Sequence, residues 1–428
     1  MTTLSHPRYL PRRSLPHPRV RARVARGVLA AALRRVPVRV LLPDGSTLGR
    51  PVDALPPDAP TLEVVRPTAL FQRLASHPKL GIGESYTAGD WQPAPGTDLA
   101  EALLPFAERL TTAVPPGLLR FRRLVDRRIP VDQRNSPQGA RRNIHAHYDL
   151  SNELFAAFLD ETMSYSSALF DERHPFAGQS LAEAQLRKVR SVLDLAGVGR
   201  DTRVLEIGTG WGTLAIEAAR RGARVTTITL SEEQAGLAAE RIAAAGFADA
   251  VDVRLADYRE VEGSFDAVVS VEMIEAVGEE YWPAYFTAID RLLAPGGTVA
   301  LQAILMEHDR YLATRTSYGW IQKHVFPGGL IPSLDAIDAT TRSLTALRVT
   351  GLTRFGAHYA ETLRRWREAF TASSGHLDRL GFGEEFRRTW EFYLAYCQAG
   401  FAAGYLDVAQ LRLQRAQARA TTSEEAGP

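Results

Sequence analysis

Hydrophobic residues in the C-terminal two thirds of the chain change their spacing in a regular way. Residues 180–195 have apolar positions three and four apart, which predicts an amphipathic helix. Short apolar runs then alternate with further helical segments, a pattern typical of a doubly wound, mostly parallel sheet. We therefore expect the α/β class, with strands at 203–207, 224–230, 251–255, 266–271 and 298–304 and helices at 211–221, 232–245 and 281–293.

The pattern before residue 140 differs and predicts a smaller α+β domain. Apolar runs at 38–42 and 62–65 predict two strands, with Asp44-Gly45 between them as a hairpin turn. Residues 1–25 are rich in Pro and Arg, a composition typical of disordered chain. We assign a disordered tail to 1–25, the small domain to 26–135, a second domain to 140–415, and an insertion covering the active face to 306–340.

Length and composition are those of a globular protein with two domains. The chain has 428 residues, of which 45% are hydrophobic and 23% charged. No apolar run reaches the length of a membrane span and no secretory signal pattern is present, so we expect a cytoplasmic protein. The single cysteine, Cys397, excludes an internal disulfide and a cysteine-based zinc site, and we expect no metal site.

Positive charge is concentrated near the N-terminus. Ten arginines and no acidic residue precede Asp44, and a second group of arginines lies within 120–142. Guanidinium groups bind phosphate well, and such clusters are attracted to anionic lipid headgroups. The same charge would also suit a nucleic acid or a solvated tail. Charge alone leaves these partners open.

A glycine-rich turn carries the sharpest chemical signal. The residues V-L-E-I-G-T-G-W-G at 204–212 run from an apolar strand into the start of a helix, and glycines there let a cofactor approach the backbone. The G-x-G-x-G spacing differs from that of the NAD-binding loop. The next strand ends in Thr229, Ser231 and Gln234, where NAD enzymes place an acidic residue. Both features favour a methyltransferase cofactor, with Glu206 facing its methionine end.

Several further motifs stand in order along the chain. They are G-I-G-E-S-Y at 81–86, H-Y-D-L-S-N at 147–152, Y-S at 165–166, the loop at 205–212, T-L-S-E-E-Q at 229–234, D-Y-R at 257–259, V-E-M-I-E-A-V-G at 271–278, F-P-G-G at 326–329 and F-G-A-H-Y at 355–359. Together they resemble the cyclopropane-fatty-acid synthase and mycolic-acid methyltransferase family over essentially the whole chain. The resemblance implies a class I Rossmann-like methyltransferase domain. The G-E-S-Y segment is similar to the phospholipid-using synthases, which carry an extra lipid-contacting domain.

The resemblance also implies which residues bind the cofactor and the reacting groups. A bicarbonate ion near the reacting carbons would be held by Glu275, Tyr359 and the backbone around Ser167 and Ile304, and Cys397 matches a family cysteine at the same site. S-adenosylmethionine is the implied cofactor. With the residues of the glycine-rich turn, its predicted contacts are Tyr165, Ser166, Glu206, Gly208, Gly210, Gly212, Thr229, Ser231, Gln234, Tyr258 and Arg259.

Three positions depart from the cyclopropane-forming members of this family. Those members usually have Cys at Ser167, His at Ala276 and His at Gln302, and the last histidine helps to hold bicarbonate. Gln302 changes the chemistry most, because an amide forms hydrogen bonds but cannot take a proton at neutral pH. The segments E-M-I-E-A-V-G at 272–278 and Q-A-I at 302–304 resemble those of an actinobacterial branch linked to tuberculostearic acid. Those enzymes methylate oleoyl chains to a 10-methylene product, which a separate reductase converts to the methyl branch.

Methyl transfer to a double bond leaves a carbocation, and the fate of the cation decides the product. Aromatic faces, for which we consider Tyr318, Trp320 and Tyr359, and a buried anion can stabilise the cation. Proton loss from the new methyl with ring closure gives a cyclopropane, whereas a hydride shift before proton loss gives an exocyclic methylene. Gln302 in place of histidine is expected to change this balance.

We therefore expect C-methylation of oleoyl chains in phospholipid, at the inner face of the membrane and without a nucleic-acid partner. One alternative is a cyclopropane-fatty-acyl-phospholipid synthase. Another is a catalytically silent lipid-binding partner, against which the intact glycine turn, Glu275 and Tyr359 count. A methyltransferase for a small soluble substrate would not need the basic N-terminal domain. Relatives in the family are often dimers, which makes a homodimer a further expectation.

Overall fold

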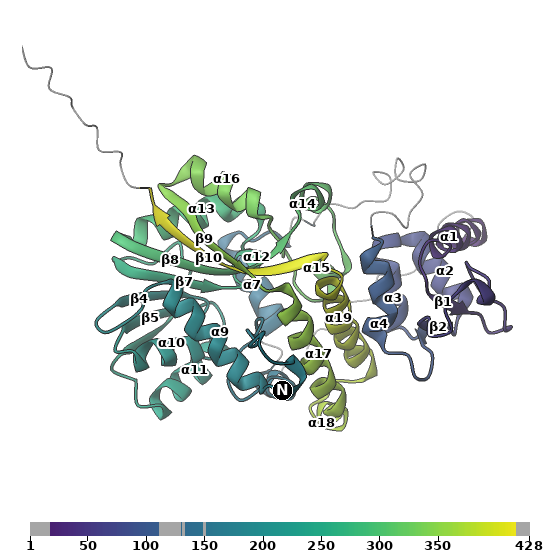
Figure 1. Ribbon diagram of the computed structural model, residues 1–428, viewed down its shortest axis with the longest axis horizontal. Helices are drawn as coiled ribbons and strands as arrows, with labels where there is room; N and C mark the ends of the chain where they lie inside the picture. The colour runs from purple at the N-terminus through teal and green to yellow at the C-terminus, as the bar shows by residue number, and fades with distance from the viewer. Residues whose placement is uncertain (1–17, 111–129, 131–132, 149–150, 417–428) are drawn as a thin grey trace, which may run out of the picture. The chain divides into compact units, whose positions relative to one another are not determined.

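The computed structural model describes residues 18–110, 130, 133–148 and 151–416 (Figure 1). The chain divides into two compact units, Met1–Val125 and Asp126–Pro428. No helix in the described part of the chain combines the length and the apolar character needed to cross a bilayer.

The first unit contains a three-stranded sheet in the order β1-β2-β3. The two predicted strands are confirmed, but β1 and β2 pair in parallel, so the predicted hairpin between them is wrong. A parallel pair needs a crossover connection; the turn at Asp44-Gly45 only leads back along β1, where Leu42 N–H bonds Ser46 O. The elements are α1 (Pro18–Leu33), β1 (Arg39–Leu41), η1 (Val52–Ala54), β2 (Thr61–Val64), α2 (Pro67–Ser76), α3 (Pro78–Thr87), β3 (Trp91–Pro93) and α4 (Leu99–Glu108).

Helix α1 corrects the predicted disordered tail. Residues 18–25 are helical, while 1–17 lie outside the described residues. The Arg, Ala and Leu residues of this segment have high helix propensity, and the helix packs against α2. The guanidinium of Arg26 lies 5.9 Å from the centre of the Phe71 ring. Tertiary packing therefore stabilises a segment whose composition alone suggested disorder.

The boundary between the units lies about ten residues earlier than predicted. The side chain of Gln133 donates to the Tyr318 hydroxyl at 3.0 Å, and that of Asn135 donates to the Gly328 carbonyl at 3.0 Å. Asn143 of α7 (Pro137–Tyr148) donates to the side chain of Asn135 at 2.7 Å. These bonds tie Gln133 and Asn135, which were assigned to the small domain, to the second unit.

The second unit contains a seven-stranded sheet in the order β6-β5-β4-β7-β8-β10-β9. The five predicted strands are confirmed and pair in parallel, which confirms the doubly wound α/β class. Two strands were not predicted, and β10 runs antiparallel to both of its neighbours. The strands are β4 (Arg203–Ile207), β5 (Arg224–Thr229), β6 (Val251–Leu255), β7 (Phe265–Val271), β8 (Leu293–Met306), β9 (Leu347–Arg354) and β10 (Leu406–Arg415).

Helices cover both faces of this sheet. Val204 packs into a core with α9, α10 and α11, whereas its neighbour Leu205 packs into a second core with α13 and α16. Alternate residues of a central strand thus face opposite helical layers. The helices of the two layers are α9 (Leu181–Leu195), α10 (Thr213–Arg220), α11 (Glu232–Ala244), α13 (Trp282–Leu292) and α16 (Leu334–Leu344).

The remaining helices lie outside these two layers of the sheet. Helices α17 and α19 pack against each other and against β10 (Figure 1). The predicted insertion at 306–340 includes α14, α15 and the start of α16, and its Leu330 N–H donates to the Glu275 carbonyl at 2.8 Å. The elements are α8 (Asn152–Ala156), η3 (Phe176–Gly178), α12 (Ile274–Val277), η4 (Glu279–Tyr281), α14 (His308–Thr314), α15 (Trp320–His324), α17 (Gly356–Ala372), α18 (Ser374–Arg379) and α19 (Glu384–Ala402).

Candidate active site

The glycine-rich turn follows β4 as predicted and adopts backbone conformations that favour glycine. Gly208, Gly210 and Gly212 have φ values of +100°, +51° and +87°. A Cβ atom on Gly208 would lie 2.6 Å from Cγ of Met273, which follows the end of β7. The turn can therefore bring the backbone close to a ligand only while this position is glycine.

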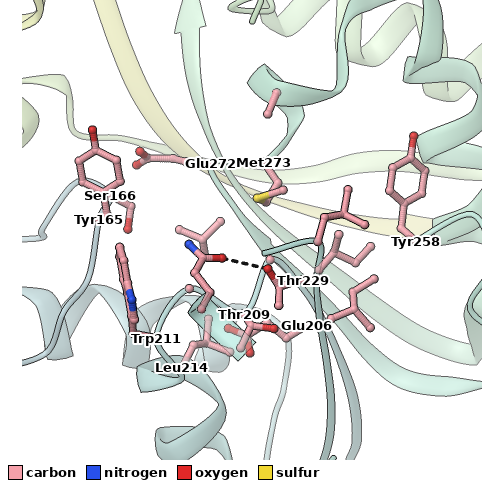
Figure 2. A pocket seen from close by; sticks show the side chains of 18 of the residues that line it. Tyr165, Ser166, Glu206, Thr209, Trp211, Leu214, Thr229, Tyr258, Glu272 and Met273 are labelled. Atoms are coloured by element: carbon pink, nitrogen blue, oxygen red, sulfur yellow. Dashed lines mark hydrogen bonds between the residues drawn. The ribbon is translucent and has the colours of Figure 1, made fainter. Parts of the chain in front are cut away.

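One cavity opens at the carboxyl ends of the parallel strands (Figure 2). Ligands of doubly wound folds bind at this edge of the sheet. Gly212 and Ser231 do not line the cavity; Gly212 precedes α10, and Ser231 caps α11 by accepting the Gln234 N–H at 3.2 Å. The predicted cofactor residues that line it are Tyr165, Ser166, Glu206, Gly208, Gly210, Thr229, Gln234, Tyr258 and Arg259.

Further polar or aromatic residues line the cavity and were not predicted as site residues, among them Lys188, Trp211, Asp257 and Glu272. Asp257 and Glu272 stand inside motifs that the sequence analysis singled out, and Trp211 stands inside the glycine-rich turn. Lys188 carried a weaker signal, as one of only three lysines. It lies on α9, and its ammonium donates to the Ser166 hydroxyl at 2.6 Å.

Glu206 places a carboxyl group inside the cavity. Its side chain is buried and accepts a hydrogen bond from the Thr227 hydroxyl at 2.6 Å. Burial raises the pKa of Glu206 to about 8, while that hydrogen bond and the charge of Lys188 oppose the rise. A buried carboxyl of this kind favours a cationic ligand, because the ligand's charge would offset the cost of ionising it.

Asp257 and Arg259 form another wall of the cavity. The guanidinium donates two hydrogen bonds, of 2.7 and 2.6 Å, to the buried carboxylate. It also lies 5.2 Å from the centre of the Tyr258 ring. Tyr258 lines the cavity beside this ion pair.

Glu272 follows β7 and collects three hydrogen bonds. Its backbone is left-handed, with a φ of +52° that is unusual for a residue with a side chain. Oε1 accepts from the Ser167 N–H at 2.9 Å and from the Gln302 amide at 2.8 Å. Oε2 accepts from the Tyr359 hydroxyl at 2.7 Å. The structure thus brings three predicted site residues together around a carboxylate that the sequence analysis did not select.

Hydrogen bonds behind Gln302 determine which end of its amide faces Glu272. The side-chain carbonyl of Gln302 accepts from the side-chain amide of Gln410 at 3.1 Å. The side-chain amide of Gln302 also donates to the main-chain carbonyl of Ser167 at 3.3 Å. Gln410 in turn accepts from the Ser191 hydroxyl at 2.7 Å. Gln302 therefore presents a donor to Glu272.

Comparison with known proteins agrees with this geometry. The family model described as mycolic acid cyclopropane synthetase matches residues 135–411. The chain belongs to this family. It is 49% identical over 409 residues to a tuberculostearic acid methyltransferase of Mycobacterium tuberculosis, covering 92% of this chain and 94% of that protein. It is 30% identical over 372 residues to the cyclopropane-fatty-acyl-phospholipid synthase of Escherichia coli, covering 86% and 91%.

Solved structures of the family match about two thirds of this chain. A mycolic acid cyclopropane synthase in complex with SAH and CTAB has a TM-score of 0.58 and 30% identity, covering 64% of this chain and 98% of that chain. A cyclopropane synthase from Mycobacterium tuberculosis has a TM-score of 0.59 and 27% identity, covering 64% and 97%. The protein is therefore an S-adenosylmethionine-dependent methyltransferase. The cavity fits that cofactor, because Glu206 suits its cationic end and Thr229, Gln234 and Asp257 offer polar groups for the remainder.

In this family member Glu275 lies behind Glu272. Its Oε1 accepts a hydrogen bond from the Ile304 N–H, and its Oε2 is buried without a hydrogen-bond partner among the described residues. Burial, together with the charge of Glu272, raises the pKa of Glu275 to about 8. Glu275 is therefore the neutral member of this carboxyl pair near pH 7.

The other predicted reacting residues, Cys397, Tyr318 and Trp320, do not line the cavity. Cys397 is a half-buried residue of α19, and burial raises the pKa of its thiol to about 12, so it stays protonated. Tyr318 accepts the bond from Gln133, and the Trp320 ring packs edge-on against Phe392 at 4.8 Å. The role of these aromatic rings in stabilising a cation stays a prediction.

The predicted bicarbonate site does not fit this chain. Among the groups that the resemblance assigns to bicarbonate, the Ser167 N–H and the Tyr359 hydroxyl donate to Glu272, and the Ile304 N–H donates to Glu275. A further anion at this position would find these three donors already bonded and would lie beside the negative charge of Glu272. The chain's own carboxyl groups take up the donor set.

Proposed function

We propose that the protein methylates the double bond of oleoyl chains in phospholipid, giving a 10-methylene-octadecanoyl product. A separate reductase would convert this product to the 10-methyl chain of tuberculostearic acid. The observation that carries this proposal is the hydrogen bond from the Gln302 amide to the Glu272 carboxylate. Gln302 stands where the cyclopropane-forming members usually have a titratable histidine, so an amide donor lies beside the carboxylate instead. The 49% identity to a protein named as a tuberculostearic acid methyltransferase supports the same assignment.

The chain's own residues would bind the cofactor, shield the reacting carbons from water and remove the proton. Glu206 and Asp257 would hold the two ends of the cofactor, which supplies the methyl group as an electrophile. The ring cluster beside Tyr165, including Phe155 at 5.1 Å and Trp366 at 5.3 Å, would keep water from the reacting carbons. A base at Glu272 would then remove the proton that decides the product.

Helix α1 supports a membrane surface as the place of reaction. Val20, Val24 and Val28 form one row at a spacing of four and are all exposed, by 58%, 62% and 37%. Exposed arginines, among them Arg19 and Arg23, flank this row. An apolar row between cationic side chains suits the boundary between anionic headgroups and acyl chains.

Proton NMR of the recovered fatty acids tests the proposed product. The protein would be incubated with oleoyl phospholipid vesicles and S-adenosylmethionine, because mass alone does not separate isomers. Vinyl signals of an exocyclic methylene are expected. Upfield ring-methylene signals would instead assign the alternative, a cyclopropane-fatty-acyl-phospholipid synthase. Unchanged oleate, with the cofactor bound, would reject both.

Replacing Gln302 with histidine is expected to shift the product toward cyclopropane. The imidazole would bring a group that can take a proton next to the position of Glu272, where the amide can only donate. The ratio of ring to vinyl signals measures the shift. Gln302→Met keeps the volume without a proton acceptor and should lose rate without gaining cyclopropane. An unchanged ratio in Gln302→His would show that this position does not control the product.

Removing two charges from α1 is expected to weaken binding to anionic vesicles. Each arginine near such a surface contributes about 1 kcal/mol, so the double variant Arg19→Gln/Arg23→Gln should bind roughly 30-fold more weakly at low salt. Vesicle co-sedimentation measures this. Arg200→Gln/Arg224→Gln removes two exposed charges from the second unit as the control. Equal losses in both double variants would mean that net charge, rather than α1, sets the affinity.

A further inference from the structure

The donor set around Glu272 has the composition of an anion site. A backbone N–H, a side-chain amide and a phenol hydroxyl come from the segment around Ser167, from β8 and from α17, and all three point at one carboxylate. Each of these groups is a hydrogen-bond donor in this arrangement. Such convergence of donors stabilises a full negative charge.

Glu272 also opens onto the cofactor cavity. Figure 2 shows its carboxylate at the same end of the cavity as Tyr165 and Ser166, and all three residues line it. The Ser167 N–H that binds Glu272 belongs to the residue that follows this Tyr-Ser pair. The carboxylate is thus held at the wall of the cavity where the Tyr-Ser pair lies.

The backbone of Glu272 is shaped for this placement. A left-handed conformation at a residue with a side chain costs free energy and persists where the surroundings enforce it. Here the Glu272 N–H donates to the main-chain carbonyl of Gln302 at 2.7 Å. Because the side chain of Gln302 also bonds the Glu272 carboxylate, β8 holds both the main chain and the side chain of Glu272. The Glu272 carboxylate meets donors from three segments, whereas the carboxyl of Glu275 meets the Ile304 N–H.

We infer that the Glu272 carboxylate is the built-in base of this enzyme and acts in place of a bicarbonate ion. This inference rests on the proposed function. Methyl transfer forms one carbon–carbon bond and breaks the sulfur–methyl bond, leaving S-adenosylhomocysteine and a cation on the neighbouring acyl carbon. A hydride shift moves the cation to the methylated carbon. Glu272 then takes a proton from the new methyl group, and the electrons of that C–H bond form the exocyclic double bond.

The surrounding charges support a base at this position. Burial raises the pKa of Glu272, which makes its carboxylate a better proton acceptor. Its three hydrogen bonds and the buried ammonium of Lys188 oppose this rise and favour the ionised form. Lys188 stands on α9 and is buried. Glu275, the neutral neighbour, adds no second full charge.

Activity in bicarbonate-depleted buffer tests this assignment. The wild-type rate is expected to be unchanged when bicarbonate is removed. Glu272→Gln should lower the rate by at least about 100-fold, the usual contribution of a general base, with unchanged affinity for S-adenosylmethionine. Glu272→Ala should be as slow but should regain rate with added bicarbonate or formate, because the emptied donor set can then accept a small anion. Glu262→Gln, an exposed glutamate of the same unit, serves as the control.

A second readout does not depend on turnover. The carbon resonance of ¹³C-bicarbonate should stay sharp with the wild type and broaden with Glu272→Ala. Broadening by the wild type, a wild-type rate that follows bicarbonate concentration, or full activity of Glu272→Ala without bicarbonate would each overturn the inference. Failure of the wild type to methylate any oleoyl phospholipid would reject the proposed function instead, and the resonance would still report on the donor set.

Discussion

Replacing Gly208 with alanine is expected to weaken binding of S-adenosylmethionine by roughly 30- to 1,000-fold. The residue has a φ of +100°, and a Cβ atom there would lie 2.6 Å from Cγ of Met273. The left-handed backbone costs an alanine about 1 kcal/mol and the close contact about 1–3 kcal/mol more. Met273 lines the cavity, so any shift that relieves the contact intrudes on the cofactor. Isothermal titration calorimetry measures the loss.

Gly246→Ala is the matched control for this change. Gly246 also has a positive φ, of +82°, but a Cβ atom there meets nothing within 4 Å. It stands just after α11, outside the cavity lining. Gly246→Ala should therefore lower the melting temperature while leaving cofactor affinity unchanged. Wild-type affinity in Gly208→Ala would show that Met273 adapts and that the turn does not need glycine.

Replacing Glu206 with glutamine is expected to stabilise the unliganded protein increasingly as pH rises from about 4.5 to about 8, and to weaken cofactor binding. The pKa of this carboxyl is near 4.5, the ordinary value for a glutamate, in the unfolded chain, and burial raises it to about 8 in the folded protein. Between these values the folded state holds the extra proton, so wild-type stability falls as pH rises, by about 1.4 kcal/mol per pH unit from this group. Glutamine keeps an acceptor for Thr227 and removes this slope.

Two measurements check the prediction for Glu206. Urea unfolding at pH 5 and pH 7.5 should show the variant gaining stability over the wild type as pH rises. Titration with S-adenosylmethionine should show roughly 10- to 100-fold weaker binding, the worth of a charge-assisted bond to a cationic group. Glu262→Gln removes an exposed carboxyl and should change neither result. Parallel stability curves for Glu206→Gln and the wild type would contradict the raised pKa.

Some parts of the site are built from contiguous residues, and others from residues that stand far apart in the sequence. The glycine-rich turn and the end of β5 are contiguous segments, and their alternation of apolar strand, turn and helix start depends on local sterics and burial. Their position and their cofactor were therefore predictable. The antiparallel strand β10 was missed, because its pairing of Leu406 with Met306 joins segments a hundred residues apart. No local spacing records such a partner.

The residues around Glu272 and Glu275 were likewise predictable only in part. The family resemblance predicted that Glu275, Tyr359 and Ser167 lie around an anion, and it singled out Gln302 as a departure at the same site. Which of the two glutamates meets those donors depends on the left-handed turn at Glu272 and on β8 and α17 converging beside it. Tertiary structure alone decided that the anion is a side chain of the protein. The physical reason is that hydrogen-bond donors from distant segments are satisfied by whichever acceptor the fold brings to them.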